Sequence, residues 1–120
     1  MAFKIAFDLE QKVVRVQDDG THKDFAPALD AMREVRQDER LQPDFGLLID
    51  LRKCTDDRTE GQAAMLTSVL RSFFAGMRLA YLPSSSTLKA VNRARLFAHD
   101  VVAIEIFDDE ATALRWLTGK

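Results

Sequence analysis

Short runs rich in β-branched and aromatic residues alternate with stretches of helical periodicity, and this alternation limits the chain to a small set of folds. Two strand-like runs come first, FKIAFDLE and KVVRVQDD, which the pair Glu10-Gln11 splits into a hairpin. Three more follow between predicted helices: FGLLIDL, MRLAYL and VVAIEIF. The order ββαβαβαβα predicts an α/β fold with a five-stranded mixed sheet, largely parallel and joined by right-handed crossovers, in one domain over residues 1–120.

Local signals mark where the predicted helices begin and end. The first helix follows Asp24, a candidate N-cap, and holds Pro27 in its first turn, where proline is tolerated. The second runs from about Glu60 to Ala75, because Thr59-Glu60-Gly61-Gln62 has the form of a capping box and Gly76 is a natural stop. The third lies in TLKAVNRARLFAHD, with one packing side made of Ala90, Ala94, Phe97 and Ala98.

The polar residues of the strand-like runs indicate how the helices are arranged around the sheet. In the first run the apolar residues Ile5, Phe7 and Leu9 alternate with Lys4, Ala6 and Asp8. In the second run, Val14 and Val16 alternate with Arg15 and Gln17. A sheet covered on both faces would show continuous apolar strands, so this alternation favours helices packed mainly on one face.

The closing stretch IEIFDDEATALRWL has two interpretations. Its acid pair Asp108-Asp109 is typical of phospho-acceptor receiver domains, but those place the pair after the first strand and a lysine after the fifth. Here the pair follows the fifth strand, the next lysine is Lys120, and Asp50 is expected inside its strand rather than at the end. We therefore interpret the stretch as a strand and a helix capped by Asp108 or Asp109. The packing residues of this helix are Ala113, Leu114, Trp116 and Leu117.

Charge and composition narrow the classes of function. The formal net charge of −2 gives no global electrostatic attraction for nucleic acid. No apolar run approaches the roughly 20 residues that span a bilayer, so we expect no membrane insertion and no signal peptide. The single Cys54 fits a reducing compartment, which favours a cytoplasmic protein. His22, His99 and Cys54 are too few soft ligands for a zinc site, and we expect no cofactor.

Four stretches of the chain resemble the SpoIIAA-like proteins, which are related to STAS and SEC14-type domains. These stretches are KIAFDLEQKVVRVQ, LLIDLRKC, RLAYLPSSSTLKAVNRARLF and IEIFDDEATALRWL, and they cover nearly the whole chain. The resemblance implies a bacterial protein whose fold is a β-α superhelix led by an extra antiparallel strand. It also implies relatives that act as phospho-switched partners of anti-sigma factors or that bind lipids.

The turn after the third predicted strand departs from the STAS pattern. STAS anti-sigma-factor antagonists carry Asp-Ser-Ser/Thr-Gly there and are phosphorylated on a serine, whereas this chain has Asp57-Arg58-Thr59-Glu60-Gly61. Thr55 and Thr59 are the only hydroxyls nearby, and a phosphate on Thr59 would meet Glu60 as a like charge. We therefore favour Thr59 as a helix cap over either threonine as a phosphorylation site.

A hydroxyl-rich loop precedes the third predicted helix. Ser84, Ser85, Ser86 and Thr87 follow a strand, at the position where open α/β sheets usually bind ligands. Free backbone N–H groups and these hydroxyls could hold a phosphate or carboxylate, although Ser and Thr are also the expected caps of a helix. Lys89 and Arg93 share a face of that helix and, with Arg78 and Arg95, form either a basic patch beside the anion site or a solvated helix face.

The predicted helix 60–75 has more apolar surface than one contact needs. Its apolar residues cover close to half of the circumference, whereas a one-sided contact needs a stripe of only about 100°. Neighbouring helices could cover the excess. Otherwise it predicts a homodimer seam or an apolar groove for an acyl chain, made by Met65, Val69, Phe73 and Phe74.

The sequence offers little for catalysis. Cys54 and His99 would form a nucleophile and base only if the fold brought them together, and the acid pairs at 56–57 and 108–109 are more typical of helix caps. We therefore expect no enzyme but a STAS-like regulatory module that binds a protein partner or itself. The alternative is a SEC14-like carrier of a small amphipathic or lipid molecule, with a groove near helix 60–75 and the 83–87 loop.

Overall fold

The structure is a computed structural model that describes residues 2–21, 25–55 and 60–119. The described elements follow the predicted order ββαβαβαβα. They are β1 (Phe3–Asp8), β2 (Val13–Asp18), α1 (Ala26–Gln37), β3 (Gly46–Asp50), α2 (Glu60–Phe73), β4 (Arg78–Leu82), α3 (Leu88–Ala98), β5 (Ala103–Ile106) and α4 (Glu110–Thr118).

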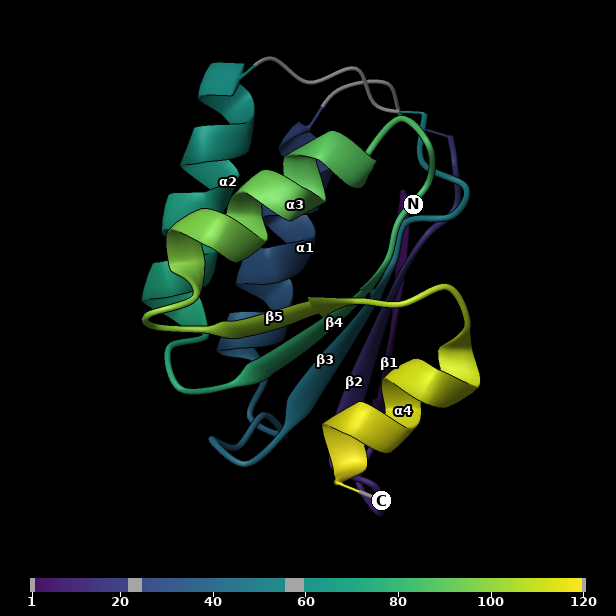
Figure 1. The fold of residues 1–120 in the computed structure, drawn as a ribbon. Helices are drawn as coiled ribbons and strands as arrows, with labels where there is room; N and C mark the ends of the chain where they lie inside the picture. Colours follow the sequence, from purple (N-terminus) through teal and green to yellow (C-terminus); the bar gives the residue numbers. More distant parts are fainter. Residues whose placement is uncertain (1, 22–24, 56–59, 120) are drawn as a thin grey trace.

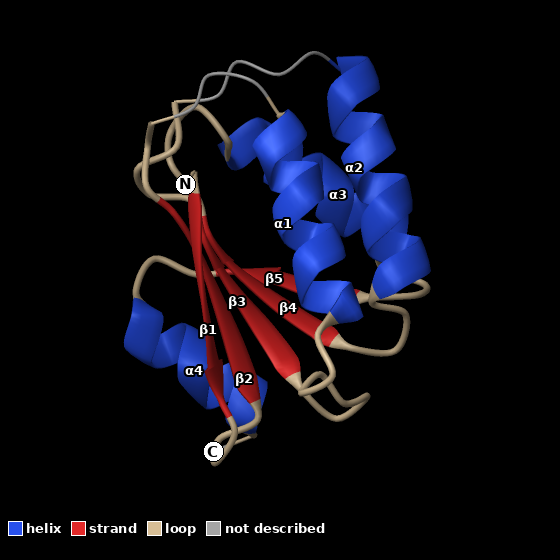
Figure 2. Ribbon diagram, turned by 180° about the vertical axis from the view of Figure 1, so that it is seen from behind, coloured by secondary structure: helices blue, strands red, loops and turns tan. Residues whose placement is uncertain are grey.

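The strands form one five-stranded mixed sheet in the order β1-β2-β3-β4-β5. The hairpin partners β1 and β2 are antiparallel, and every following pair is parallel. Helices α1, α2 and α3 lie side by side on one face of this sheet, and α4 lies alone on the other (Figures 1 and 2). The predictions of an α/β fold, a mixed sheet and helices mainly on one face are therefore confirmed.

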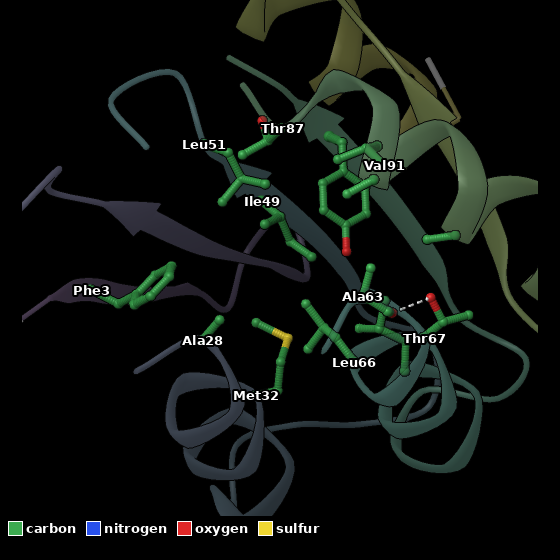
Figure 3. Close-up of a pocket in the computed structure, with 14 residues that line it drawn as sticks. Phe3, Ala28, Met32, Ile49, Leu51, Ala63, Leu66, Thr67, Thr87 and Val91 are labelled. Atoms are coloured by element: carbon green, nitrogen blue, oxygen red, sulfur yellow. Dashed lines mark hydrogen bonds between the residues drawn. The ribbon is translucent and has the colours of Figure 1, made fainter. Parts of the chain in front are cut away.

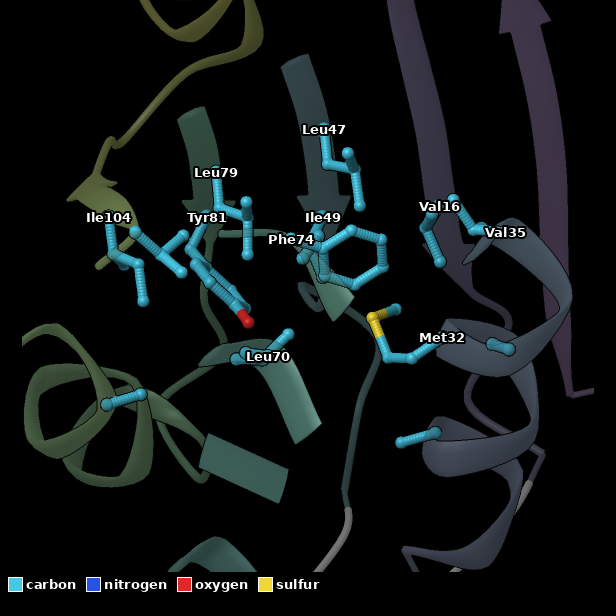
Figure 4. Close-up of a cluster of buried hydrophobic side chains, with 14 of the residues drawn as sticks. Val16, Met32, Val35, Leu47, Ile49, Leu70, Phe74, Leu79, Tyr81 and Ile104 are labelled. Atoms are coloured by element: carbon cyan, nitrogen blue, oxygen red, sulfur yellow. The ribbon is translucent and has the colours of Figure 1, made fainter. Parts of the chain in front are cut away.

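The main core lies between the sheet and helices α1 to α3 (Figure 4). Every second residue of the central strands points into it, as the period of a strand requires. The helices contribute Met32 and Val35 from α1, and Leu70 from α2 with Phe74 directly after that helix. The strands contribute Val14, Val16, Leu47, Ile49, Leu79, Tyr81 and Ile104.

A smaller core lies between the sheet and α4. Its buried residues are Val13, Leu48, Ala80, Leu82 and Ala113. Leu117 of α4 packs directly over Gly46, where an added Cβ would stand 2.8 Å from Leu117 Cδ2. Trp116 is only half-buried and packs on Phe107, with ring centroids 5.6 Å apart. The predicted packing residues of the last helix are confirmed, but full burial of Trp116 is not.

The helix ends show which local signals were correct. Asp109 caps α4, because its carboxylate accepts hydrogen bonds from Thr112 N at 2.8 Å and from Thr112 Oγ1 at 2.9 Å. Gly76 has the predicted positive φ, 81°, but it lies in the turn after α2, because the helix already ends at Phe73 and not at Ala75. Phe25 is the N-cap of α1 and makes no side-chain capping bond. The proposed caps Asp24 and Thr59 lie outside the described residues.

Two expectations from the sequence are wrong. Asp50 was expected inside its strand, but it is the last residue of β3. Phe97 was expected on the packing side of α3, but its side chain is 64% exposed. It lies about 100° from Ala98 around the helix, at the edge of the apolar stripe, where it faces away from the core.

Among the described helices, none is both long and apolar enough to cross a bilayer.

Candidate functional site

The hydroxyl loop between β4 and α3 is tied to the loop that follows β3. Ser84 Oγ and Ser86 Oγ each donate a hydrogen bond of 2.9 Å to the carbonyl oxygen of Cys54. Thr87 Oγ1 accepts from Ser84 N at 2.9 Å, which closes the turn that precedes α3, whereas Thr87 as the N-cap of α3 makes no side-chain capping bond to the helix. Thr87 is buried, whereas Ser85 is exposed.

This hydrogen bonding bears on the predicted anion site. Three of the four hydroxyls already bond to protein groups, so an anion would compete with Cys54 and with the turn itself. Lys89 is exposed and Arg93 is half-buried on α3. Anion binding at Ser84, Ser85, Ser86 and Thr87 stays a prediction, whereas the hydrogen bonds give three of these hydroxyls a structural role. Arg78 is not part of a patch with Lys89, because it lies on the α4 side and donates to Trp116 O at 2.9 Å.

An apolar pocket lies under α2, next to this loop (Figure 3). Side chains from α1, α2, α3 and the strands surround it, among them Met32, Ile49, Leu66, Thr87 and Val91. Its volume is about 40 Å³, whereas pockets for drug-sized ligands measure roughly 300–1,000 Å³. The pocket is where the carrier interpretation expects a groove, but the present space holds only one or two water-sized groups.

The apolar residues of α2 are divided between core and surface. Phe74 is fully buried, so it is not available to a groove or to a second copy of the chain. Val69 and Phe73 are half-buried against the main core, and only Met65 is well exposed, at 53%. Helices α1 and α3 both contact α2, and Leu66, Val69 and Phe73 of α2 pack against the main core. The excess that the sequence shows is therefore mainly core.

The largest exposed apolar side chains lie instead on α3. Leu96 is 70% exposed and Phe97 is 64% exposed, side by side near the end of the helix. Phe97 also lines a groove between α2 and α3, with a volume of about 590 Å³. We call this region the α2–α3 surface: Gly61, Ala64, Thr67, Ser68, Arg71, Arg93 and Phe97, which line the groove, together with Lys89 and Leu96.

An arginine fixes the geometry of this surface. Arg71 of α2 donates to Phe97 O at 2.8 Å and to Asp100 Oδ1 at 2.6 Å. These bonds join α2 to the end of α3, so the backbone that carries Phe97 is held in place. The hydrogen bond from Arg71 also holds the pKa of the Asp100 carboxyl below its usual range. Sequence reasoning missed the surface, although two adjacent large apolar residues beside a polar helix face are a signal for it.

Basic residues gather in the segment that carries the α2–α3 surface. Residues 61–99 contain five basic residues and no Asp or Glu, so every acidic residue of the chain lies outside this segment. On the α2–α3 surface this gives Arg71, Lys89 and Arg93, with Arg95 beside them. Arg71 is paired with Asp100, and Arg95 stands 3.7 Å from Glu105. Acidic residues that follow the segment therefore compensate part of its positive charge, and Arg93 also takes part in an interaction.

A charged cluster on the α4 face was also missed. Asp50 is buried at the end of β3 and accepts hydrogen bonds from Arg52 Nε at 3.0 Å and Nη2 at 2.8 Å. Arg15 Nη2 stands 3.4 Å from the same carboxylate, and Arg15 Nη1 forms an ion pair with Glu110 of α4. Burial favours a raised pKa for Asp50, but the bonds and charges of Arg52 and Arg15 outweigh it and lower the pKa. The charges of the two carboxylates and the two guanidiniums cancel. The ion pairs of this cluster join β2, β3 and α4.

The candidate catalytic groups do not assemble. Cys54 is buried beside the loop that begins α3, whereas His99 is exposed after its last turn. The 11 residues of α3 separate the two by about 16 Å along the axis. Among the described residues, no three His, Cys, Asp or Glu side chains are placed to hold a metal ion. Thr55 is exposed, while Asp56, Asp57 and Thr59 lie outside the described residues.

Comparisons with known proteins give no relative from which a role could be transferred. No family model, no curated protein and no solved structure matches the chain.

Proposed function

We propose that the chain is a SpoIIAA-like, STAS-like module without enzymatic activity that acts by binding a protein partner through the α2–α3 surface. The observation that carries this proposal is the exposure of Leu96 and Phe97 beside a groove. Burying such a side chain contributes roughly 1.5–3 kcal/mol, so an interface that covered both would gain a useful share of its affinity there. Single exposed apolar residues are ordinary, but an adjacent pair next to a groove is the form of an interaction site.

The arrangement of the sheet supports the STAS-like part of the proposal. Strands follow one another in sequence order, and α1 to α3 connect β2 to β5 on the same face. A β-α superhelix with an added antiparallel strand would have this order. The family assignment still rests on the sequence resemblance, and determining a close relative's structure would test it.

A carrier of a small amphipathic or lipid molecule is the second candidate, and the pocket under α2 favours it. Because that pocket measures about 40 Å³, a ligand with an acyl chain would require α2 to move away from the sheet. Native mass spectrometry of the purified chain tests this function. A bound acyl species would support the carrier, and a ligand-free chain would count against it.

Site-specific photo-crosslinking in cells of the source organism tests partner binding. A photoreactive residue at position 96 should give a covalent adduct of defined mass. The matched control is position 34, where Glu34 lies exposed on α1 and should give no such adduct. The adduct at position 96 should also disappear in a Phe97→Ser background. The same adduct from both positions, or none from position 96, would refute docking at this surface.

A further inference from the structure

We infer that a second copy of the chain pairs with the outer edge of β1, so that two sheets join into one across a two-fold axis at Ala6. Strand β1 lies at the end of the sheet and pairs with β2 alone (Figure 2). This edge shares no residue with the α2–α3 surface, so the inference does not depend on the proposed function.

The backbone of β1 has unpaired groups along its outer edge. Asp19 N donates to Ala2 O at 3.0 Å, which makes these two residues a hydrogen-bonded pair of the β1–β2 ladder. Hydrogen-bonded pairs alternate along an antiparallel ladder, so every second residue of β1 after Ala2 bonds to β2. Of the residues between them, Ile5 and Phe7 direct their N–H and C=O groups outward. Such an edge is a template on which an antiparallel strand can pair.

The charged residues of β1 favour one register for that pairing. Lys4 and Asp8 are exposed on the same side of the strand, and in the part of the chain that the structure describes neither forms an ion pair. Asp8 accepts two hydrogen bonds from Gln11, a neutral residue. If Ala6 stands opposite Ala6 of the second copy, Lys4 of each copy stands opposite Asp8 of the other. Both pairs are then of the non-hydrogen-bonded kind, which brings the side chains closest.

This match selects a copy of β1 rather than an unrelated strand as the occupant. Lysine on the edge of a sheet ordinarily discourages pairing. An antiparallel copy of β1 supplies the opposite charge on both sides of the axis, so the edge is self-complementary, as a two-fold dimer requires. On the other side of the strand, the same register places Ile5 opposite Phe7, and both side chains pack against the main core of their own copy.

An exposed leucine and a groove meet in the same register. Leu9 follows β1 directly, and its side chain is 58% exposed. A groove of about 440 Å³ lies beside the start of β1 and is lined by Phe3, Ile5 and Glu34 among others. With Ala6 on the axis, Leu9 of one copy comes opposite Phe3 of the other, beside this groove. Each copy therefore removes the leucine of the other from water.

Sedimentation equilibrium of the full chain at low salt tests the dimer. The parent should show a monomer–dimer equilibrium. Lys4→Glu and Asp8→Lys each place like charges opposite one another, so each variant alone should raise the dissociation constant about fivefold or more. An equimolar mixture of the two variants should recover the affinity of the parent, because every like-charge pair becomes an opposite-charge pair in the mixed dimer. A mixture that associates no better than either variant would refute the register.

Oxidative crosslinking tests the position of the two-fold axis. Ala6→Cys places two thiols opposite each other, at a Cα separation that a disulfide can span, so it should give a covalent dimer. Lys4→Cys is the matched control, because position 4 is also exposed on β1 but lies four residues along the strand from its own copy. Equal crosslinking at positions 4 and 6 would overturn the proposed axis.

Two further variants separate this dimer from the α2–α3 surface. Leu9→Ser should weaken the dimer, because it removes the side chain that enters the groove of the second copy. Leu96→Ser/Phe97→Ser should leave the dimer unchanged. A parent that stays monomeric at millimolar concentration would overturn the inference and leave the proposed function intact. A dimer that the serine pair abolishes and the charge variants do not would place self-association on the α2–α3 surface and would also overturn the inference.

Discussion

The two faces of the sheet are stabilised in different ways. Helices α1 to α3 cover one face and bury a continuous apolar core between themselves and the strands (Figure 4). The other face carries α4 alone, with a core of five buried residues. There, arginines from the sheet hold both ends of the helix: Arg15 pairs with Glu110 at its start, and Arg78 donates to Trp116 O near its end.

The residues that stabilise the fold and the residues available to a partner therefore lie in different parts of the molecule. The three-helix face buries a large apolar core, and Leu96 and Phe97, on the outside of the same layer, are not part of it. The α4 face has no such surplus and depends on half-buried aromatics and ion pairs. Substitutions on the main face should therefore cost the most stability, those on the α4 face less, and those at the α2–α3 surface almost none.

The largest effect is expected for Phe74→Ala on the main face. Phe74 is fully buried between α2 and the sheet, so its removal leaves a cavity and should lower the free energy of unfolding by about 3 to 5 kcal/mol. Urea denaturation measures the loss. Phe73→Ala is the control, because Phe73 is half-buried and packs edge-on to Phe74. Equal losses for the two variants would contradict the assignment of Phe74 to the centre of the core.

A smaller loss is expected for Trp116→Ala on the α4 face. A fully buried Trp would cost about 3 to 5 kcal/mol, but Trp116 is half-buried, so we expect about 2 kcal/mol. The loss comes from the contact with Phe107 and from the Arg78 guanidinium, which lies 5.5 Å from the ring centroid. Trp116→Phe keeps a ring there and should lose less. A thermal midpoint unchanged by the alanine substitution would show that α4 does not need this contact.

Asp50→Asn should lower the free energy of unfolding by about 1 to 2 kcal/mol at neutral pH. The substitution removes the carboxylate that accepts the hydrogen bonds of Arg52 and faces the charge of Arg15. The folded-state pKa of Asp50 is lowered, so the ionised carboxylate stabilises the fold above about pH 4. That contribution disappears as the pH falls through the lowered pKa, where the parent becomes protonated as well. The urea midpoints of the parent and of Asp50→Asn, measured from pH 7 to pH 2, should therefore approach each other as the pH falls.

Asp44→Asn serves as the control for this pH dependence. The Asp44 carboxylate pairs with Lys12 at 2.5 Å, but both side chains are 56% exposed, so solvent screens the pair. Its substitution should leave the urea midpoint nearly unchanged at neutral pH. A constant difference between Asp50→Asn and the parent at every pH would show that the Asp50 charge is not what stabilises the cluster.

Sequence patterns predicted the backbone better than the surface. Alternation of strand-like and helical runs was enough for the element order, and Asp109 acts only on neighbouring residues, so its role as a helix cap was predictable. Asp50 was missed because a lone carboxylate in an apolar run shows neither the end of the strand nor its two arginines. Phe97 was misplaced because it lies at the edge of an apolar stripe. Whether a residue at the edge of that stripe is buried depends on where α2 packs beside α3, and the sequence of α3 does not show this.

The smallest effect on stability is expected for Leu96→Ser/Phe97→Ser at the α2–α3 surface. Both side chains are exposed, at 70% and 64%, so the free energy of unfolding should change by less than about 0.5 kcal/mol. Phe74 lies in the same layer and should cost several times more, although it is the same residue type as Phe97. Urea denaturation of the two variants side by side measures the ratio. A loss above about 1 kcal/mol for the serine variant would mean that Leu96 and Phe97 pack within the fold, and it would remove the reason to assign them to a partner.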